Sequence, residues 1–581
     1  MHIETIPNRG SPPAILLREG WREGAKVRKR TLANLTHWPK AKIEALRRVL
    51  KNEPLIAPGE ALTIERSLPH GHVEAVLAAM RRLGLANLLG TQPSRPRQLV
   101  LAMIAQRVLD PCSKLATTRL WRTTTLGDEL GVADAGVQEL YSALDWLLAR
   151  QKRIEAKLAS RHLGEGSLAL YDVTSSSYEG RTCPLARFGH NRDGQHDLPC
   201  IVYGVLTDGD GRPVGVQAYP GNTSDPTTVA DQVDKLRQGF ALERVVLVGD
   251  RGMLTGTQIR RLREYPQLGW ISALRSADIR KLVAGGQLQL SLFDQQDLAE
   301  IASAEFPGER LVVCFNPLLA EQRRCKRAEL LAATEKDLDK IVASARRRTR
   351  KLLTDEQIGL KVGKVLGRFK MAKHFELTIG AGRLTFKRDE SKIAAESATD
   401  GIYVIRTSEP AGRLSAEDAV RNYKGLAHVE RAFRTLKGID LRVRPIYHHL
   451  ADHVRGHLLL CLLAYYVEWH MRKALAPLLF ADEELDQARR VRDPVKPARP
   501  SAAVKAKKVN RQTADGLEVH SFQTLLAALA TRCRNRCRFA AAIGANGSAV
   551  ELEPLEIVTE QTPLQARTMK LLEVCSQYCK P

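Results

Sequence analysis

The sequence predicts a mixed α/β protein in which a mixed five-stranded sheet flanked by helices forms the core, with an inserted subdomain and a helical N-terminal module. Three strand-like runs, a helix and a fourth strand follow one another between residues 167 and 250. Apolar residues recur at three- and four-residue steps between 62 and 163, which is typical of packed helices. A further polar motif at 419–441 comes far later in the chain, so the residues between are predicted to hold an insertion.

The composition favours a polyanionic partner. The chain has 581 residues, and 89 Lys and Arg against 65 Asp and Glu give a formal net charge of +24. Such a surplus attracts nucleic acid by counterion release and steering. The first residues lack the apolar run of a signal peptide, and the ten cysteines are scattered along the sequence. The longest apolar run, 457–469, is too short to span a bilayer. We therefore expect a cytoplasmic protein with reduced thiols, a buried helix at 457–469 and no membrane partner.

The N-terminal third is predicted to consist of two parts. Residues 1–61 are expected to form a basic β arm. Gly20 and Gly24 are turn signals for a small basic hairpin at 14–36, and a solvated β arm is the alternative. Residues 62–163 are expected to form a helical DNA-binding module. No helix-turn-helix can be located in it.

The core is predicted at 164–275 and 401–475, and two of its strands lead into carboxylates. The apolar run LALY leads into Asp172, and VVLVG leads into Asp250. A carboxylate at the edge of an apolar core is costly unless a cation or hydrogen bonds compensate it. Three strands, a helix and a fourth strand are also the order of a ribonuclease H-like fold, in which such carboxylates bind metal.

The stretch 419–441 is predicted to be one helix with two faces. Tyr423, Glu430 and Lys437 are spaced seven residues apart, with Arg434 one turn from Glu430 on the same side. Apolar residues occupy the opposite face. One carboxylate among cationic and phenolic groups suits a metal-bound phosphate site.

At these residues the chain resembles the bacterial insertion-sequence DDE transposases with a Tyr-Arg-Glu-Lys signature, a group like insertion sequence four. The spacing Tyr423-x2-Leu426-x3-Glu430-x6-Lys437 carries the resemblance, as do DVTS at Asp172, PGNTSD at 220–225 and DRGM at Asp250. One position departs, because Leu426 stands where the family has Arg. The missing phosphate contact is first sought at three nearby cations: Lys424, Arg431 and Arg434.

The resemblance implies a ribonuclease H-like transposase that binds terminal inverted repeats and cleaves and joins DNA. Asp172, Asp250 and Glu430 would hold two Mg²⁺ ions, with Mn²⁺ as a substitute. Tyr423, Arg434 and Lys437 would position DNA phosphates. The implied partners are double-stranded DNA, both repeat and target, and a second copy in a homodimeric paired-end complex. Two alternatives stay open: a ribonuclease H-like nuclease and a catalytically degenerate DNA-binding regulator.

The insertion is predicted at 276–400, with strands and a basic helix. Residues 321–351 contain 11 Lys or Arg and 5 Asp or Glu, so this helix either lies along DNA or is a solvated helix with ion pairs. Trp270, Phe375 and Phe386 either stack on a base or, as we favour, pack in a core.

The region after the catalytic helix gives weaker signals. His449, His453 and His457 recur at four-residue steps, which suggests either a zinc face or, preferably, packing and phosphate contact. Residues 476–581 are expected to form a basic linker, flexible at 489–512, and a helical C-terminal region. The Cys533/Cys537 and Cys575/Cys579 pairs are a weak zinc candidate because neither has two-residue spacing, and the first is expected on a helix.

Overall fold

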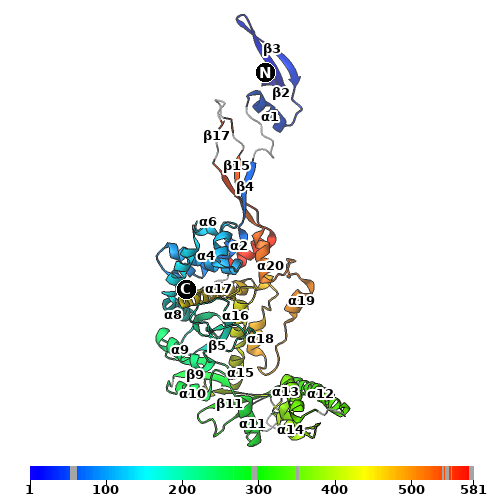
Figure 1. Ribbon diagram of the computed structural model, residues 1–581. Coiled ribbons are helices and arrows are strands. Elements are labelled where there is room, and N and C mark those ends of the chain that lie inside the picture. The colour runs from blue at the N-terminus through cyan, green and yellow to red at the C-terminus, as the bar shows by residue number, and fades with distance from the viewer. Residues whose placement is uncertain are drawn as a thin grey trace.

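The protein is elongated, with a small β-sheet at one end and a helical subdomain at the other (Figure 1). The computed structural model describes residues 1–52, 62–265, 267–288, 293, 297–348, 353–539, 542–543, 549–550 and 553–574. Among these residues no helix combines the length and apolar character needed to cross a membrane. Cys575 and Cys579 lie outside the described residues.

Five strands form the expected ribonuclease H-like order, β7-β6-β5-β8-β9. The strands are β5 (Ser167–Ser177), β6 (Cys200–Asp208), β7 (Pro213–Pro220), β8 (Val245–Val248) and β9 (Leu268–Ala273). β5 pairs antiparallel with β6 and parallel with β8, so it is the central strand of this part of the sheet. The helical elements between β7 and β9 are η1 (Asp225–Thr228), α9 (Val229–Asp234), η2 (Lys235–Gly239) and α10 (Gly256–Leu262).

The sheet is larger than the sequence predicted, because it has eight strands in the order β10-β11-β14-β9-β8-β5-β6-β7. The three additional strands are β10 (Leu298–Ile301), β11 (Arg310–Phe315) and β14 (Ile402–Thr407). β14 pairs antiparallel with β9, and β11 pairs with β14 along its whole length. The first part of the insertion therefore adds the strands β10 and β11 to the core sheet, and the later part forms a separate subdomain. With β14, it adds a buried apolar face of Leu311, Val313 and Val404.

The outer part of the insertion has a core of its own. It consists of α12 (Pro317–Arg347), α13 (Asp355–Phe369), η4 (Ala372–His374), β12 (Phe375–Gly380), β13 (Arg383–Arg388) and α14 (Glu390–Ser397), with α11 (Ser276–Ala284) nearer the sheet. α12 begins where the Asn316 side chain accepts hydrogen bonds from the Leu318 and Leu319 amides. Phe375 and Phe386 pack edge to face in this core, and Trp270 is buried in β9. The preferred packing role of these three aromatic side chains is confirmed.

A buried helix, α17 (Ala451–Ala474), joins the core to the helical module. It packs against β7, α4 and α7, and Gly456 lets it approach α7, where a Cβ would lie 3.1 Å from the Leu144 carbonyl oxygen. The module contains α2 (Gly71–Arg82), α3 (Leu85–Leu89), α4 (Arg95–Leu109), α5 (Lys114–Leu120), α6 (Leu126–Leu130), α7 (Val137–Leu148) and α8 (Gln151–His162). The prediction of a buried helix at 457–469 is confirmed.

The N-terminal region is not purely helical. β1 (His2–Asn8), β2 (Ser11–Glu23) and β3 (Lys26–Asn34) form a three-stranded sheet followed by α1 (Lys40–Leu50). The chain turns at Gly24, which has φ +62°, whereas Gly20 lies inside β2, so the predicted turn at Gly20 is wrong. β4 (Leu62–Pro69) is a strand at the start of the segment expected to be helical, because it pairs with β15 from the far end of the chain.

The C-terminal region differs from its prediction in two ways. Cys533 and Cys537 lie on the strand β15 (Cys533–Phe539) and not on the predicted helix, because this segment pairs with β4 and β18. The segment 489–512 is partly helical and packed: Val495 is buried between α18 (Leu485–Val491) and α19 (Ala502–Asn510). The remaining elements are η5 (Ala476–Leu478), α20 (Phe522–Ala530), β16 (Ala542–Ile543), β17 (Ala549–Val550), β18 (Leu555–Val558) and α21 (Pro563–Val574).

Candidate active site

Asp172 lies on β5, and Asp250 lies two residues past the end of the neighbouring strand β8. In the parallel pairing of β5 with β8, Leu170 is opposite Val248, and each aspartate comes two residues later. Alternation along a strand places residues two apart on the same face. The sequence therefore brings these two carboxylates together by register alone.

The Asp172 carboxyl has too little compensation for its charge. Burial and, to a smaller extent, the neighbouring Asp250 charge raise its pKa to about 7, although a hydrogen bond from the Val173 amide and the Arg192 charge both act to lower it. This is the environment of a carboxylate that a cation would stabilise. The residues present therefore fit a divalent cation on chemical grounds.

Asp250 is held in a tight turn at the end of β8. Its Oδ1 accepts hydrogen bonds from the amides of Gly252 and Met253, at 3.0 and 2.7 Å, and the Ser272 hydroxyl donates to its backbone carbonyl. A Cβ at position 252 would lie 3.4 Å from both carboxylate oxygens. The turn fixes the carboxylate while leaving Oδ2 available for a ligand.

The motif at 419–441 is two helices rather than one. α15 (Ala416–Lys424) ends at Gly425, and α16 (Ala427–Lys437) begins after Leu426, because the Leu426 amide bonds to the Tyr423 carbonyl, only three residues back. A Cβ added to Gly425 would lie 3.7 Å from the Leu170 side chain, two residues before Asp172. The junction thus lies directly against the strand that carries the first aspartate.

Tyr423 is the residue that links the three predicted carboxylates. Burial raises the pKa of its hydroxyl to about 12, and the charges of Asp250, Asp172 and Glu430 all contribute to that rise. Glu430 itself is exposed on α16, which packs across β5 and β6. Within the part of the chain that the structure describes, no three His, Cys, Asp or Glu side chains are close enough to hold a metal ion. The three-carboxylate assignment therefore stays a prediction.

Lys437 makes a buried ion pair that the sequence did not indicate. Its ammonium donates to Asp193 Oδ1 at 3.0 Å and to the Ser175 carbonyl, and Arg444 pairs with the same carboxylate oxygen at 2.6 Å. Asp193 Oδ2 also accepts from the Ser177 amide, and its side chain is only 3% exposed. These contacts hold the end of α16 against β5, so Lys437 has a structural partner besides any phosphate.

The cations considered as substitutes for the missing arginine lie in different surroundings. Lys424 donates to the Pro494 and Val495 carbonyls, and Arg434 is exposed. Arg431 acts electrostatically on His428. The arginine whose charge lowers the pKa of Asp172 is Arg192, which pairs with Asp225 of the PGNTSD motif at 2.5 Å. Nothing in the local sequence around Leu426 could have indicated Arg192.

The histidine and cysteine candidates do not form a metal site in the described residues. His449 precedes α17, whereas His453 and His457 lie on it, and all three line a cavity with basic side chains. His457 is buried and bonds to the Val443 carbonyl, which agrees with the preferred packing role.

Comparisons with known proteins agree with the observed core. The family model of the transposase DDE domain matches residues 165–467, more than half of the chain. The N-terminal domain model of the IS1634 family transposases matches residues 3–57. No curated protein matches the chain. A solved piggyBac transposase synaptic complex with hairpin DNA is similar at 9% identity and a TM-score of 0.32, covering 79% of this chain and 77% of that chain, a likeness too low to support a conclusion.

Proposed function

Because the chain belongs to the DDE transposases of the IS1634 family, we propose that it binds the terminal inverted repeats of its own mobile element and cuts and joins DNA there. The observation that carries this proposal is that Asp172 lies on β5 and Asp250 directly follows the adjacent strand β8, with the Tyr423 hydroxyl in the field of both and of Glu430. The net charge of +24 supports a DNA partner.

In this proposal the carboxylates of Asp172, Asp250 and Glu430 hold divalent cations, with Mg²⁺ as the physiological ion and Mn²⁺ as a substitute. Such ions supply an activated water or 3′-hydroxyl and stabilise the leaving oxygen. Asp250 is oriented by its turn, and the exposure of Glu430 leaves it free to approach the aspartates when DNA binds.

The remaining site residues orient the DNA strand. Tyr423 keeps its proton because burial among carboxylates raises its pKa, so its hydroxyl can donate to a phosphate oxygen. Arg434, exposed on α16, would contact a flanking phosphate. Lys437 fixes α16 through Asp193 and adds positive charge near the strand. We further infer that two copies act together, one at each end of the element.

The function is tested with purified protein and a DNA fragment carrying one end of the element. We expect a specific cut with Mg²⁺ or Mn²⁺ and none with EDTA, while binding of the fragment persists in EDTA. Cutting of RNA–DNA hybrids in preference to the end fragment would favour a ribonuclease H-like nuclease instead. Tight binding without any metal-dependent cut would favour a degenerate regulator.

A further inference from the structure

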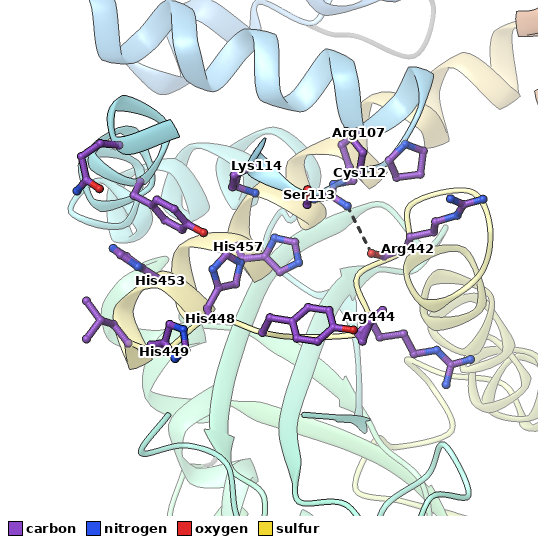
Figure 2. Close-up of a pocket in the computed structure, with 16 residues that line it drawn as sticks. Arg107, Cys112, Ser113, Lys114, Arg442, Arg444, His448, His449, His453 and His457 are labelled. Atoms are coloured by element: carbon purple, nitrogen blue, oxygen red, sulfur yellow. Dashed lines mark hydrogen bonds between the residues drawn. The ribbon is translucent and has the colours of Figure 1, made fainter. Parts of the chain in front are cut away.

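A cavity of about 640 Å³ lies between the helical module and the core, apart from the aspartates (Figure 2). The module contributes residues from α4, α5 and α7, and the core contributes the segment 442–457, which leads into α17. The volume is within the range of sites that hold small organic ligands. It is much larger than a single bound water or ion requires.

Among the residues that the structure describes, the lining of this cavity contains no carboxylate side chain. It contains Arg107, Lys114, Arg442 and Arg444 together with four histidines. Figure 2 shows Lys114, Arg107 and the labelled histidines near one another, whereas the side chains of Arg442 and Arg444 extend away from Lys114. A concave surface lined by one sign of charge concentrates ligands of the other sign.

Lys114 is the residue of this cavity best placed to bind an anion. It is 6% exposed and lines the cavity beside Arg107. Burial, together with the Arg107 charge, lowers its pKa to about 7. Burying a charged ammonium next to another cation is costly, and a bound anion would reduce that cost.

Arg107 lies beside Lys114, and its guanidinium is already oriented. The buried Arg107 guanidinium donates to the Leu441 and Arg442 carbonyls, both at 3.4 Å, and Figure 2 marks the second of these bonds. These long contacts satisfy only part of the donor capacity of a guanidinium. Together Arg107 and Lys114 offer donors for a phosphate group.

Flat rings form another part of the cavity wall. Tyr141 stacks on His453, with ring centroids 4.9 Å apart and an interplanar angle of 23°, and His448 meets the Tyr141 edge. Burial and the Lys114 charge lower the pKa of His448 to about 3, so this ring is neutral at physiological pH. Neutral aromatic surface beside cationic donors suits a nucleotide, which carries a base and a phosphate.

We propose that this cavity binds a nucleotide of the DNA strand that the protein holds, with its phosphate on Lys114 and Arg107. The proposal deepens the proposed function and depends on it for the identity of the strand. The cavity is connected to the catalytic helix, since Arg444 in its wall shares Asp193 with Lys437 of α16. An occupied cavity would thus fix the helical module, the core and the strand relative to one another.

The test uses full-length protein in EDTA, so that it measures binding without cutting. We expect Lys114→Met to weaken binding of the end fragment about 5- to 20-fold and to lower the slope of log K against log salt by about 1, the change for one lost phosphate contact. Lys152→Met, on the exposed side of α8, is the matched control and should change neither quantity by more than about twofold. Lys114→Arg should keep most of the affinity.

A second measurement distinguishes a phosphate of DNA from a free nucleotide as the ligand of the cavity. Inorganic phosphate and deoxyadenosine monophosphate should raise the melting temperature of the wild-type protein and have a smaller effect on Lys114→Met. Equal salt slopes for Lys114→Met and Lys152→Met would overturn the proposal. Nucleotide binding that is lost in Lys114→Met without any change in DNA binding would also overturn it, and would assign the cavity to a free nucleotide. Because EDTA prevents catalysis, none of these results depends on whether the three carboxylates cut DNA.

Discussion

Asp172→Asn, Asp250→Asn and Glu430→Gln should each lower the Mg²⁺-dependent cutting of the end fragment by at least about 10³-fold. Loss of a residue that only orients a metal ligand costs about 10- to 100-fold, and loss of a ligand should cost more. The measurement is single-turnover cleavage of labelled DNA. Each variant should still bind the fragment in EDTA with affinity within about threefold of the wild type.

Asp172→Asn provides its own check that the variant is folded. Because the pKa of Asp172 is raised to about 7 from an ordinary 3.8, the folded state binds more protons than the unfolded state between those values, and its stability falls as the pH rises through this window. The asparagine side chain does not ionise, so the variant does not lose stability in this way as the pH rises. In metal-free buffer at pH 8 the variant should therefore be more stable than the wild type by about 1–3 kcal/mol, with the difference vanishing near pH 4. Normal cutting by any of the three variants would remove that residue from the site.

Asp193→Ala should loosen the attachment of α16 to β5. It removes a buried carboxylate that pairs with Lys437 and Arg444 and accepts the Ser177 amide proton. Breaking a buried pair leaves an uncompensated charge and costs about 3–5 kcal/mol. Native-state hydrogen exchange should show faster exchange of the amides in 173–178 and 427–437 by about 10²- to 10³-fold, the equivalent of about 3–4 kcal/mol.

The matched control for this prediction is Asp418→Ala. Asp418 pairs with Arg421 on α15, but its side chain is 53% exposed, so its loss should cost less than about 1 kcal/mol. If Asp193→Ala left exchange in both segments as slow as Asp418→Ala does, the Asp193 contacts would not be what holds α16 in place.

The core was predictable from the sequence because its signals are local. Short apolar runs that lead into Asp172 and Asp250 predict both the strands and the carboxylates that these runs lead into. The order of strands and helices along the chain then predicts that the two strands pair in parallel. The sheet extension was not predictable in this way. β11 and β14 are separated by nearly a hundred residues, and such pairings leave no local pattern.

Other features depend on contacts between distant segments. β15 is a strand because it pairs with β4 and β18, and the Arg-rich composition hid its period-two alternation. Asp193 lies in a loop that reads as an ordinary turn, and only the fold brings it to Lys437. Lys114 resembles any surface lysine in the sequence, and its burial beside Arg107 appears only when the helical module packs on the core.

The most direct measurement is mapping of the metal position with Fe²⁺ in place of Mg²⁺. In the presence of ascorbate and peroxide, iron produces hydroxyl radicals that cut the polypeptide near its ligands. On the DNA-bound protein we expect cuts in three windows, around residues 172, 250 and 430. Cuts around 172 and 250 with none between 425 and 435 would show that Glu430 does not reach the ions bound by the two aspartates.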